Sequence, residues 1–299
     1  MKIAILGATS QIAKDFIVGL SQDAAHELYL FARNPKEVVH TAGSVACGYH
    51  EFLTADRYDL IINFVGIGDP ARAKAMGHKV FEVTEYYDNM ALAYLERHTS
   101  CRYIFLSSGA VYGDSFTHPV TESSPAIINI NRLQPTDWYT IAKLYAEAKH
   151  RAMSAASIID VRVFNYFSHT QDMNARFLIT DLVRAIKSHQ IFRTSAENII
   201  RDFITPTDLY ELFLCAINAD PCNLAIDCYT KAPVDKLSLL KVLKKKFRLN
   251  YELVSSGSAV NATGIKNHYY STNTIAEKLG YQPKLSSVDG LVREISKLM

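Results

Sequence analysis

The chain begins with a strand, a glycine turn and a helix, and this order constrains the fold more than any other feature of its 299 residues. The apolar run Lys2–Leu6 predicts a short buried strand, which passes directly into a turn of small and polar residues at 7–13. An amphipathic helix is expected to follow, to about Leu20. In such a unit, backbone N–H groups of the turn and the helix N-terminus face one point, where a pyrophosphate can bind.

This corner is typical of a Rossmann unit, although its glycine motif is reduced. Gly7 is present, whereas Ser10 and Ala13 stand where further glycines are expected. Ser10 is short and carries a hydroxyl, and Ala13 is small enough for close packing of helix on sheet. The residues that we expect at the cofactor phosphates are Gly7, Thr9, Ser10, Gln11 and Ile12.

The end of the second expected strand, at residues 27–31, bears on the choice of cofactor. An acidic residue there would accept hydrogen bonds from the ribose hydroxyls of NAD, but this chain has Ala32, followed by Arg33 and Asn34. A guanidinium can pair with a 2′-phosphate and stack on adenine, which favours NADP(H) over NAD(H). The competing interpretation is a solvent-facing arginine at a turn.

A third buried strand is expected at residues 58–64, followed by a turn of small residues at 65–68 that a cofactor could approach. We assign Phe64, Val65 and Gly66 to the cofactor on this basis. A helix is expected at 82–97, where Asn89 interrupts the apolar pattern. Asn89 either bridges backbone groups near the cofactor, where we place it, or is polar surface.

The candidate catalytic residues come from a strand end and a helix. The apolar run 103–106 predicts a buried strand that stops at a polar turn, residues 107–113. Tyr139 and Lys143 lie four apart in a segment rich in helix formers, so their side chains share a helix face. A neighbouring ammonium should bring the tyrosine pKa down from about 10, and Ser108 could hold the same reacting oxygen. A tyrosine and a lysine at this spacing also occur on solvated helix faces, but the serine turn and the N-terminal motif make the set specific for moving a proton on or off an alcohol or carbonyl.

Composition narrows the class of protein. The content of 48% hydrophobic and 21% charged residues is ordinary for a soluble globular chain, and a net charge of +2 gives no support for a nucleic-acid or membrane surface. The five cysteines are odd in number and include no C-x-x-C pair. We therefore expect reduced thiols in a cytoplasmic protein, with neither a disulfide framework nor a metal site.

Taken together, these motifs resemble the extended short-chain dehydrogenases/reductases of the nucleotide-sugar epimerase/dehydratase group. The resemblance covers nearly the whole chain. It departs from the family at Ser10 and Ala13, and at residues 48–50 (Gly-Tyr-His), where an acidic residue usually faces adenine. The matching positions are residues 7–13, residues 107–113 (S-S-x-x-V-Y-G), Tyr139 with Lys143, Arg162 with Asn165 (R-x-x-N), residues 201–204 (R-D-F-I), Asp208 and residues 279–283 (L-G-[WY]-x-P).

The resemblance implies an α/β fold: a doubly wound parallel Rossmann sheet with a smaller, intercalated C-terminal α/β substrate domain. Residues 1–165 would bind NADP, with parts of roughly 200–230 returning to that domain, and residues 166–299 would mostly bind a nucleotide sugar. It also implies a homodimer formed through two helices, one of which carries Tyr139. The apolar face of Leu144, Ala148 and Ala152 is suited to that interface and equally suited to packing on the sheet.

By position, Tyr139 resembles the catalytic acid/base, Lys143 its pKa-lowering partner and nicotinamide-ribose ligand, and Ser108 the hydroxyl that binds the reacting oxygen. Asn165 and Arg201 resemble residues that hold the diphosphate, and Lys266 lies near the expected substrate site.

The resemblance also limits the reaction. The family's dehydratases have Asp-Glu where this chain has Gly109 and Ala110, and its C3/C5 epimerases have Cys in place of Ala110. A 4-reductase that delivers hydride from NADPH to a 4-keto-6-deoxy sugar nucleotide, with Tyr139 as proton donor, is favoured because Arg33 indicates NADP. A 4-epimerase with retained NAD(P) is the alternative, and a non-catalytic NADP-binding sensor or scaffold the second. The resemblance further suggests a role in deoxysugar and polysaccharide synthesis.

Overall fold

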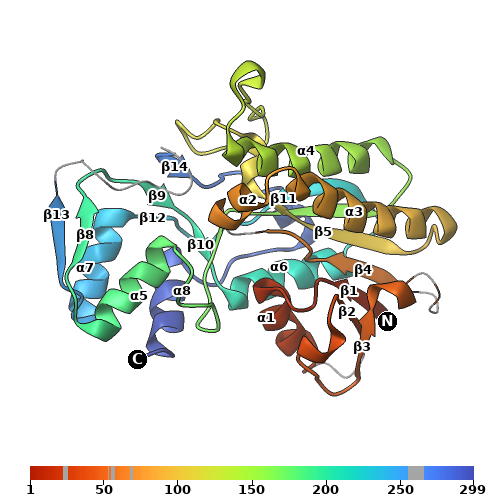
Figure 1. Cartoon of the computed structure of the whole chain (residues 1–299), viewed down its shortest axis with the longest axis horizontal. Coiled ribbons are helices and arrows are strands. Elements are labelled where there is room, and N and C mark those ends of the chain that lie inside the picture. The colour runs from red at the N-terminus through yellow and green to blue at the C-terminus, as the bar shows by residue number, and fades with distance from the viewer. Residues whose placement is uncertain (23–25, 53, 55–57, 68–69, 255–265) are drawn as a thin grey trace.

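The apolar runs of the N-terminal half form the strands of one parallel sheet. The computed structural model describes residues 1–22, 26–52, 54, 58–67, 70–254 and 266–299. Seven strands pair in the order β3-β2-β1-β4-β5-β6-β11, and all six pairings are parallel (Figure 1). Their bounds are β1 Lys2–Leu6, β2 Glu27–Ala32, β3 Ser44–Gly48, β4 Leu60–Asn63, β5 Arg102–Ser108, β6 Ile158–Val163 and β11 Asn223–Asp227.

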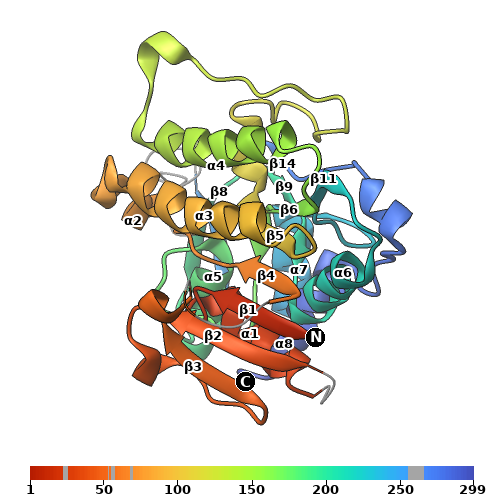
Figure 2. The ribbon, with the colours of Figure 1, turned by 90° about the vertical axis from the view of Figure 1, so that its right-hand side faces the viewer.

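Helices cover both faces of this sheet, which explains why its strands are apolar on both sides. Along β1, Ile3 and Ile5 point into one buried cluster and Ala4 and Leu6 into another. The first cluster lies under α1 and α6, and the second under α3 and α4. Figure 2 shows α3 and α4 side by side on one face of the sheet. The helix bounds are α1 Gln11–Leu20, α2 Pro70–Met76, α3 Lys79–Arg97, α4 Pro135–Ala152 and α6 Pro206–Asn218.

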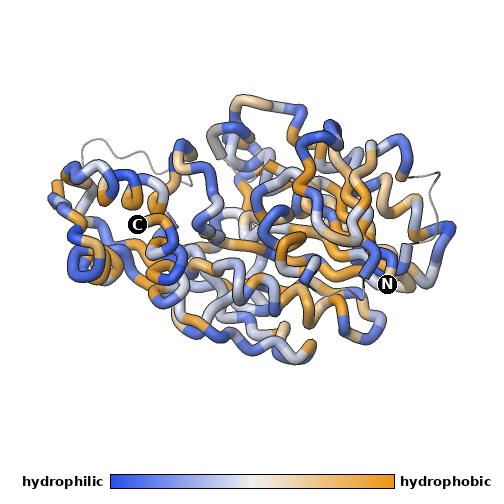
Figure 3. Tube along the Cα trace, turned by 90° about the horizontal axis from the view of Figure 1, so that it is seen from below, coloured by the Kyte–Doolittle hydropathy of each residue, from blue (hydrophilic) through white to orange (hydrophobic). Residues whose placement is uncertain are grey.

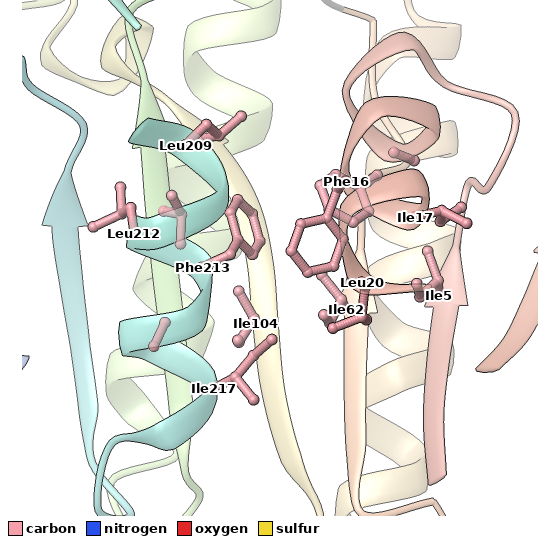
Figure 4. Close-up of a cluster of buried hydrophobic side chains, with 14 of the residues drawn as sticks. Ile5, Phe16, Ile17, Leu20, Ile62, Ile104, Leu209, Leu212, Phe213 and Ile217 are labelled. Carbon is pink, nitrogen blue, oxygen red and sulfur yellow. The ribbon is translucent and has the colours of Figure 1, made fainter. Parts of the chain in front are cut away.

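Three phenylalanines fill the layer between α1, α6 and the sheet. The ring centroids of Phe16 and Phe213 are 5.0 Å apart, and those of Phe64 and Phe213 are 5.3 Å apart. Around them lie aliphatic side chains of the two helices and of β1, β4 and β5 (Figure 4). Each buried phenylalanine contributes about 2–3 kcal/mol of transfer free energy, so this layer fixes both helices on the sheet.

The C-terminal half forms a smaller lobe of short strands and three helices, at the left of Figure 1. Apolar residues gather in the interior of both lobes (Figure 3). In the smaller lobe β13 pairs with β8, β9 lies between β12 and β14, and β7 pairs with β10. The bounds are β7 Asn165–Tyr166, β8 Phe192–Ser195, β9 Ile200–Arg201, β10 Phe203–Ile204, β12 Val234–Asp235, β13 Tyr251–Val254, β14 His268–Tyr269, α5 Leu178–Ser188, α7 Lys236–Phe247 and α8 Ser287–Ser296.

The two lobes are interleaved along the chain. After α5 and β8 of the smaller lobe, the chain returns to add α6 and β11 to the large sheet, and then goes back to form β12 and α7. The predicted fold class, a doubly wound parallel sheet with an intercalated C-terminal α/β part, is confirmed. Short 3-10 helices connect the elements: η1 Pro35–Glu37, η2 Tyr49–Glu51, η3 Gly109–Tyr112, η4 Ile130–Arg132 and η5 Ile275–Leu279.

In the part of the chain that the structure describes, every helix is too short or too polar to cross a membrane.

Candidate active site

Ser108 and Tyr139 meet where the carboxyl end of β5 approaches the first turns of α4. Their side chains share a hydrogen bond, and Ser108 Oγ also accepts a hydrogen bond of 3.1 Å from the Ala110 amide. Ser108 is the last residue of β5, so the polar turn begins at Gly109, two residues later than the sequence predicts. A third hydroxyl belongs to Tyr269 of β14, which is hydrogen-bonded to Ser108 as well. The Ser108 hydroxyl is therefore held between the phenols of two lobes.

Lys143 lies one helical turn beyond Tyr139, and its side chain is buried against β5. Its Nζ donates a 2.8 Å hydrogen bond to the Leu106 carbonyl and stands 4.1 Å from the centre of the Phe105 ring. Burial lowers the pKa of Lys143 to about 8, against the opposing charges of nearby carboxylates. A Cβ atom built on Gly66 would lie 3.3 Å from Nζ, so the ammonium reaches the exposed loop that follows β4.

The expected lowering of the Tyr139 pKa by Lys143 is wrong for the state that the structure shows. Burial raises the pKa of Tyr139 to about 12, and the hydrogen bond from Ser108 only partly offsets it. Lys143 is not among the groups that shift it, since its ammonium is turned to the β5 backbone. At neutral pH Tyr139 is thus a proton donor.

A buried ionic cluster fixes the far half of α4. His150 has no exposed surface, and its two ring nitrogens lie 2.8 Å from Asp88 of α3 and 2.6 Å from Asp160 of β6. Asp88 also accepts a hydrogen bond of 3.1 Å from Tyr103, which accepts one from Asn63 at the end of β4. The helix that carries Tyr139 and Lys143 is therefore tied to α3, β4, β5 and β6 at once.

The glycine turn follows β1 in a backbone conformation that requires glycine, and the Gly7 and Ala8 amides both donate to the Phe31 carbonyl of β2. Gly7 has φ +77°, and a Cβ there would lie 2.9 Å from the Val65 amide nitrogen, so only glycine fits. Ser10 is the N-cap of α1, and its Oγ accepts a 3.4 Å hydrogen bond from the Ala13 amide. Its hydroxyl supports the helix whose N-terminus faces the turn. Thr9 and Ile12 are partly buried beside them.

Three other expected cofactor residues use their side chains within the protein. Gln11 Nε2 donates to Asp15 and to Thr170, so this side chain links α1 to the second lobe. Phe64 is buried in the α1/α6 layer, which leaves only its backbone near the turn. Asn34 caps η1 through a 3.3 Å hydrogen bond from the Lys36 amide.

Asn89 does not join the group near Lys143. It lies on the exposed side of α3, and its Oδ1 accepts a 2.6 Å hydrogen bond from Lys149. The polar-surface alternative is the one that fits this position. Val65 is held by a 2.9 Å hydrogen bond from its amide to Asn63 Oδ1, and Arg33 is exposed at the end of β2.

Two cations from the second lobe converge near Ser108. Arg201 of β9 is 6% exposed, and its guanidinium lies 5.8 Å from the centre of the Tyr269 ring. Lys266 Nζ lies 5.2 Å from the same ring and donates a 2.9 Å hydrogen bond to the Gly113 carbonyl. Burial lowers the pKa of Arg201 to about 10 and also lowers the pKa of Lys266. Arg201 forms no ion pair with the described residues, so this buried positive charge is suited to an anionic ligand.

Asn165 lies close to this group but uses its amide within the protein. Its Nδ2 donates to the carbonyls of Asp202 and Tyr269, at 3.1 and 3.3 Å. It therefore joins β7 to the residue between β9 and β10 and to β14, and it holds the backbone of Tyr269.

Sequence patterns missed three residues of the site. Tyr269 lies in no motif, although Lys266, three residues earlier, is a predicted substrate residue. His150 has no signal beyond its place on the helix of Tyr139. Tyr49 falls in the departure at residues 48–50, and that departure was the only sign that the residue is special.

Comparison with known proteins agrees with this geometry. Residues 3–225 match the model of the NAD dependent epimerase/dehydratase family. The protein UDP-glucose 4-epimerase 4 of Oryza sativa subsp. japonica is 30% identical over 170 residues, a match that spans 54% of this chain and 40% of that protein.

Two solved structures share the fold at low identity. A UDP-glucose 4-epimerase with UDP-glucose from Thermotoga maritima superposes with a TM-score of 0.84 at 16% identity, covering 100% of this chain and 98% of that one. A dTDP-glucose 4,6-dehydratase from Bacillus anthracis, in complex with NAD, has a TM-score of 0.78 at 15% identity, covering 99% and 96%. The family match over three quarters of the sequence, on a fold that brings Ser108, Tyr139 and Lys143 together, shows that the chain belongs to the NAD dependent epimerase/dehydratase family.

Proposed function

We propose that the chain oxidises and reduces C4 of a nucleoside-diphosphate sugar, and that it acts as a 4-epimerase with a retained NAD(P) cofactor. The observation that carries the proposal is the meeting of Ser108, Tyr139 and Lys143 with two cations, the buried Arg201 and the partly buried Lys266. The names of the relatives support it, since UDP-glucose 4-epimerases are found both by sequence and by fold.

The proton-moving part of the reaction belongs to Ser108 and Tyr139. A sugar oxygen placed against both hydroxyls would be held at the atom that loses or gains the proton, while the bound nicotinamide supplies and takes up the hydride. With a pKa of about 12, Tyr139 is ready to donate a proton to a C4 oxygen at neutral pH. Taking a proton from a C4 hydroxyl requires that pKa to fall, and the Lys143 ammonium one turn away is the group placed to lower it when the site is filled.

The diphosphate of the substrate would lie between the two lobes, at Arg201 and Lys266. A lone buried guanidinium is unfavourable without an anion, and a diphosphate offers oxygens that it can engage in pairs. Lys266 adds a second positive charge next to the turn after β5, at the Gly113 carbonyl. Asn165 would act on the substrate through Tyr269, which it holds, because its own amide is occupied.

A second function, an NADPH-dependent 4-reductase of a 4-keto-6-deoxy sugar nucleotide, is supported by a different observation. The end of β2 carries buried Ala32 and exposed Arg33, which offer a 2′-phosphate a cation and offer ribose hydroxyls no acidic partner. A protonated Tyr139 is also the form that a net reduction consumes. A third candidate, a non-catalytic NADP-binding protein, has no use for an intact Ser–Tyr–Lys set.

One pair of assays separates these functions. The purified chain is incubated with UDP-glucose or UDP-galactose without added cofactor, and with 4-keto-6-deoxy forms of GDP, dTDP, CDP and UDP sugars plus NADPH or NADH. Epimerisation that is absent in Tyr139→Phe would establish the epimerase, and stoichiometric NADPH loss that is absent in Tyr139→Phe would establish the reductase instead. Dinucleotide binding without turnover of any sugar would favour the binding protein and reject both enzymes.

We also propose a homodimer through the outer faces of α3 and α4. Two large aromatic side chains are exposed there, Tyr86 at 63% and Tyr145 at 50%, and Ala148 and Ala152 leave room for close helix packing. Light scattering of the wild type and of Tyr145→Glu tests this: a dimer that becomes a monomer in the variant supports the interface.

A further inference from the structure

A pair of tyrosines stands beside the glycine turn and takes no part in the chemistry described above. Tyr49 is the first residue after β3, and its Oη accepts a 3.0 Å hydrogen bond from the Gly7 amide. Its ring centroid lies 4.5 Å from that of Tyr87 on α3, at an interplanar angle of 50°. The two rings thus come from separate elements and meet over the carboxyl ends of β1 and β2.

Arg33 completes this group at its solvent side. Ala32 of β2 is paired with Gly48 of β3, so Arg33 and Tyr49 directly follow the last pair of neighbouring strands. Burial raises the pKa of Tyr49 and of Tyr87, and the positive charge of Arg33 opposes this at both. Arg33 is exposed and forms no ion pair within the described part of the chain. Both rings are only partly buried, so aromatic surface and a cation remain open next to Gly7.

We infer that Tyr49 and Tyr87 form an aromatic wall for the adenine ring of the dinucleotide, with Arg33 at its edge for the 2′-phosphate. The inference rests on the proposed NAD(P)-dependent function and assigns the adenine contact that residues 48–50 left open. Tyr49 replaces an acidic hydrogen-bond acceptor with a π surface. Because its oxygen accepts the Gly7 N–H, the Tyr49 ring is held against the glycine turn.

The expected size of the effect follows from base stacking on aromatic side chains. Removing such a ring weakens binding by about 1–3 kcal/mol per base, which corresponds to about 5- to 150-fold in Kd. The loss should be equal for ligands with and without a 2′-phosphate, because both carry the same adenine. Loss of Arg33 should weaken only the ligands that carry the phosphate.

The test is calorimetric titration of the full chain, after removal of any dinucleotide that it retains on purification, with two probes of the adenosine half, 2′,5′-ADP and 5′-AMP, followed by NADPH and NADH. The variants are Tyr49→Ala, Tyr49→Phe and Arg33→Ala, with Tyr251→Ala as the matched control, a partly buried tyrosine on β13 of the smaller lobe. We expect Tyr49→Ala to weaken both probes at least 5-fold and Tyr49→Phe less than 3-fold. Arg33→Ala should weaken 2′,5′-ADP alone, and Tyr251→Ala should change neither.

Unchanged or tighter binding of both probes by Tyr49→Ala would overturn the inference. The circular dichroism melt of Tyr49→Ala shows whether that variant folds. If it does not fold, Tyr49→Leu replaces it, because leucine keeps an apolar side chain without the π surface, and unchanged or tighter binding of both probes by Tyr49→Leu would overturn the inference. A wild type that binds the probes as expected but converts no sugar nucleotide rejects the proposed function and leaves the wall in place. A wild type that binds no dinucleotide and no probe rejects the wall itself.

Discussion

The ionic cluster around His150 makes the stability of the fold depend on pH in a direction that can be measured. His150 is fully buried, and each ring nitrogen faces a carboxylate, on Asp88 and on Asp160. Both nitrogens can donate only in the imidazolium form. Burial by itself would lower the pKa of His150, but the two carboxylates outweigh it and raise the pKa to about 9.

The size of the effect follows from the two pKa values. The unfolded chain has a histidine pKa of 6.5, and the interval to about 9, at about 1.36 kcal/mol per pH unit, corresponds to about 3 kcal/mol. Between these values the folded chain binds one proton more than the unfolded chain. The stabilisation is therefore fully present below pH 6.5 and is lost as the pH rises through 9.

The perturbation that tests this is His150→Gln, which fills the site but cannot become charged. We expect the difference in unfolding free energy between wild type and variant to fall by about 3 kcal/mol from pH 6 to pH 9.5. Urea unfolding at several pH values, with a reductant for the cysteines, measures it. Lys143 titrates in both proteins and cancels in the difference.

His78→Gln is the control, since His78 is 79% exposed, and its difference from wild type should not change with pH by a comparable amount. A difference for His150→Gln that is constant from pH 6 to pH 9.5 would refute the buried imidazolium.

Three further substitutions test the site. Lys143→Met should raise the unfolding free energy at pH 7 by about 2 kcal/mol, because relief of the buried charge gains about 3 kcal/mol and the lost hydrogen bond to Leu106 costs about 1 kcal/mol. Above pH 10.5 neither state carries the charge, so the gain should turn into a loss of about 1 kcal/mol; urea unfolding at both pH values measures it. Arg201→Met should weaken UDP binding at least 10-fold in calorimetry without lowering the melting temperature, since the guanidinium has no ion pair among the described residues; a variant that binds UDP like wild type would contradict the diphosphate role. Gly113→Ala should lower the melting temperature by several degrees, because φ is +62° and the new Cβ would lie 2.0 Å from the Ile127 carbonyl oxygen; an unchanged melt would show that the turn relaxes freely.

The large sheet could be predicted because its central strands are continuous apolar runs. Strand β3 lacked that signal: it is an edge strand, Val45 is 54% exposed, and its segment mixes serine, alanine and glycine. The strands of the second lobe were harder still, since several contain two residues and depend on partners far along the chain, as β14 depends on β9. No local pattern specifies such pairings.

Motif spacing indicated the catalytic set, but not its electrostatics. Tyr139 and Lys143 are neighbours on α4, yet the ammonium binds the Leu106 carbonyl and the phenol binds Ser108. The hydrogen-bond partner of each side chain depends on how deeply that side chain is buried, and the spacing of two residues in the sequence does not indicate burial. The position of Asn89 could not be predicted for a similar reason. A polar residue that interrupts an apolar pattern does not indicate whether its side chain faces solvent or the site.

The return of α6 and β11 to the large sheet has a consequence for how the chain can be divided. Removal of everything after residue 165 would expose β6 as an edge and strip Phe16 and Phe64 of the α6 side chains that cover them. The first 165 residues then lose part of their own core, whereas the buried cluster of the smaller lobe is built only from residues after 165. Recombination with a related protein therefore has to exchange α6 and β11 together with the first 165 residues, and a crossover at the lobe boundary in sequence would yield an insoluble chain.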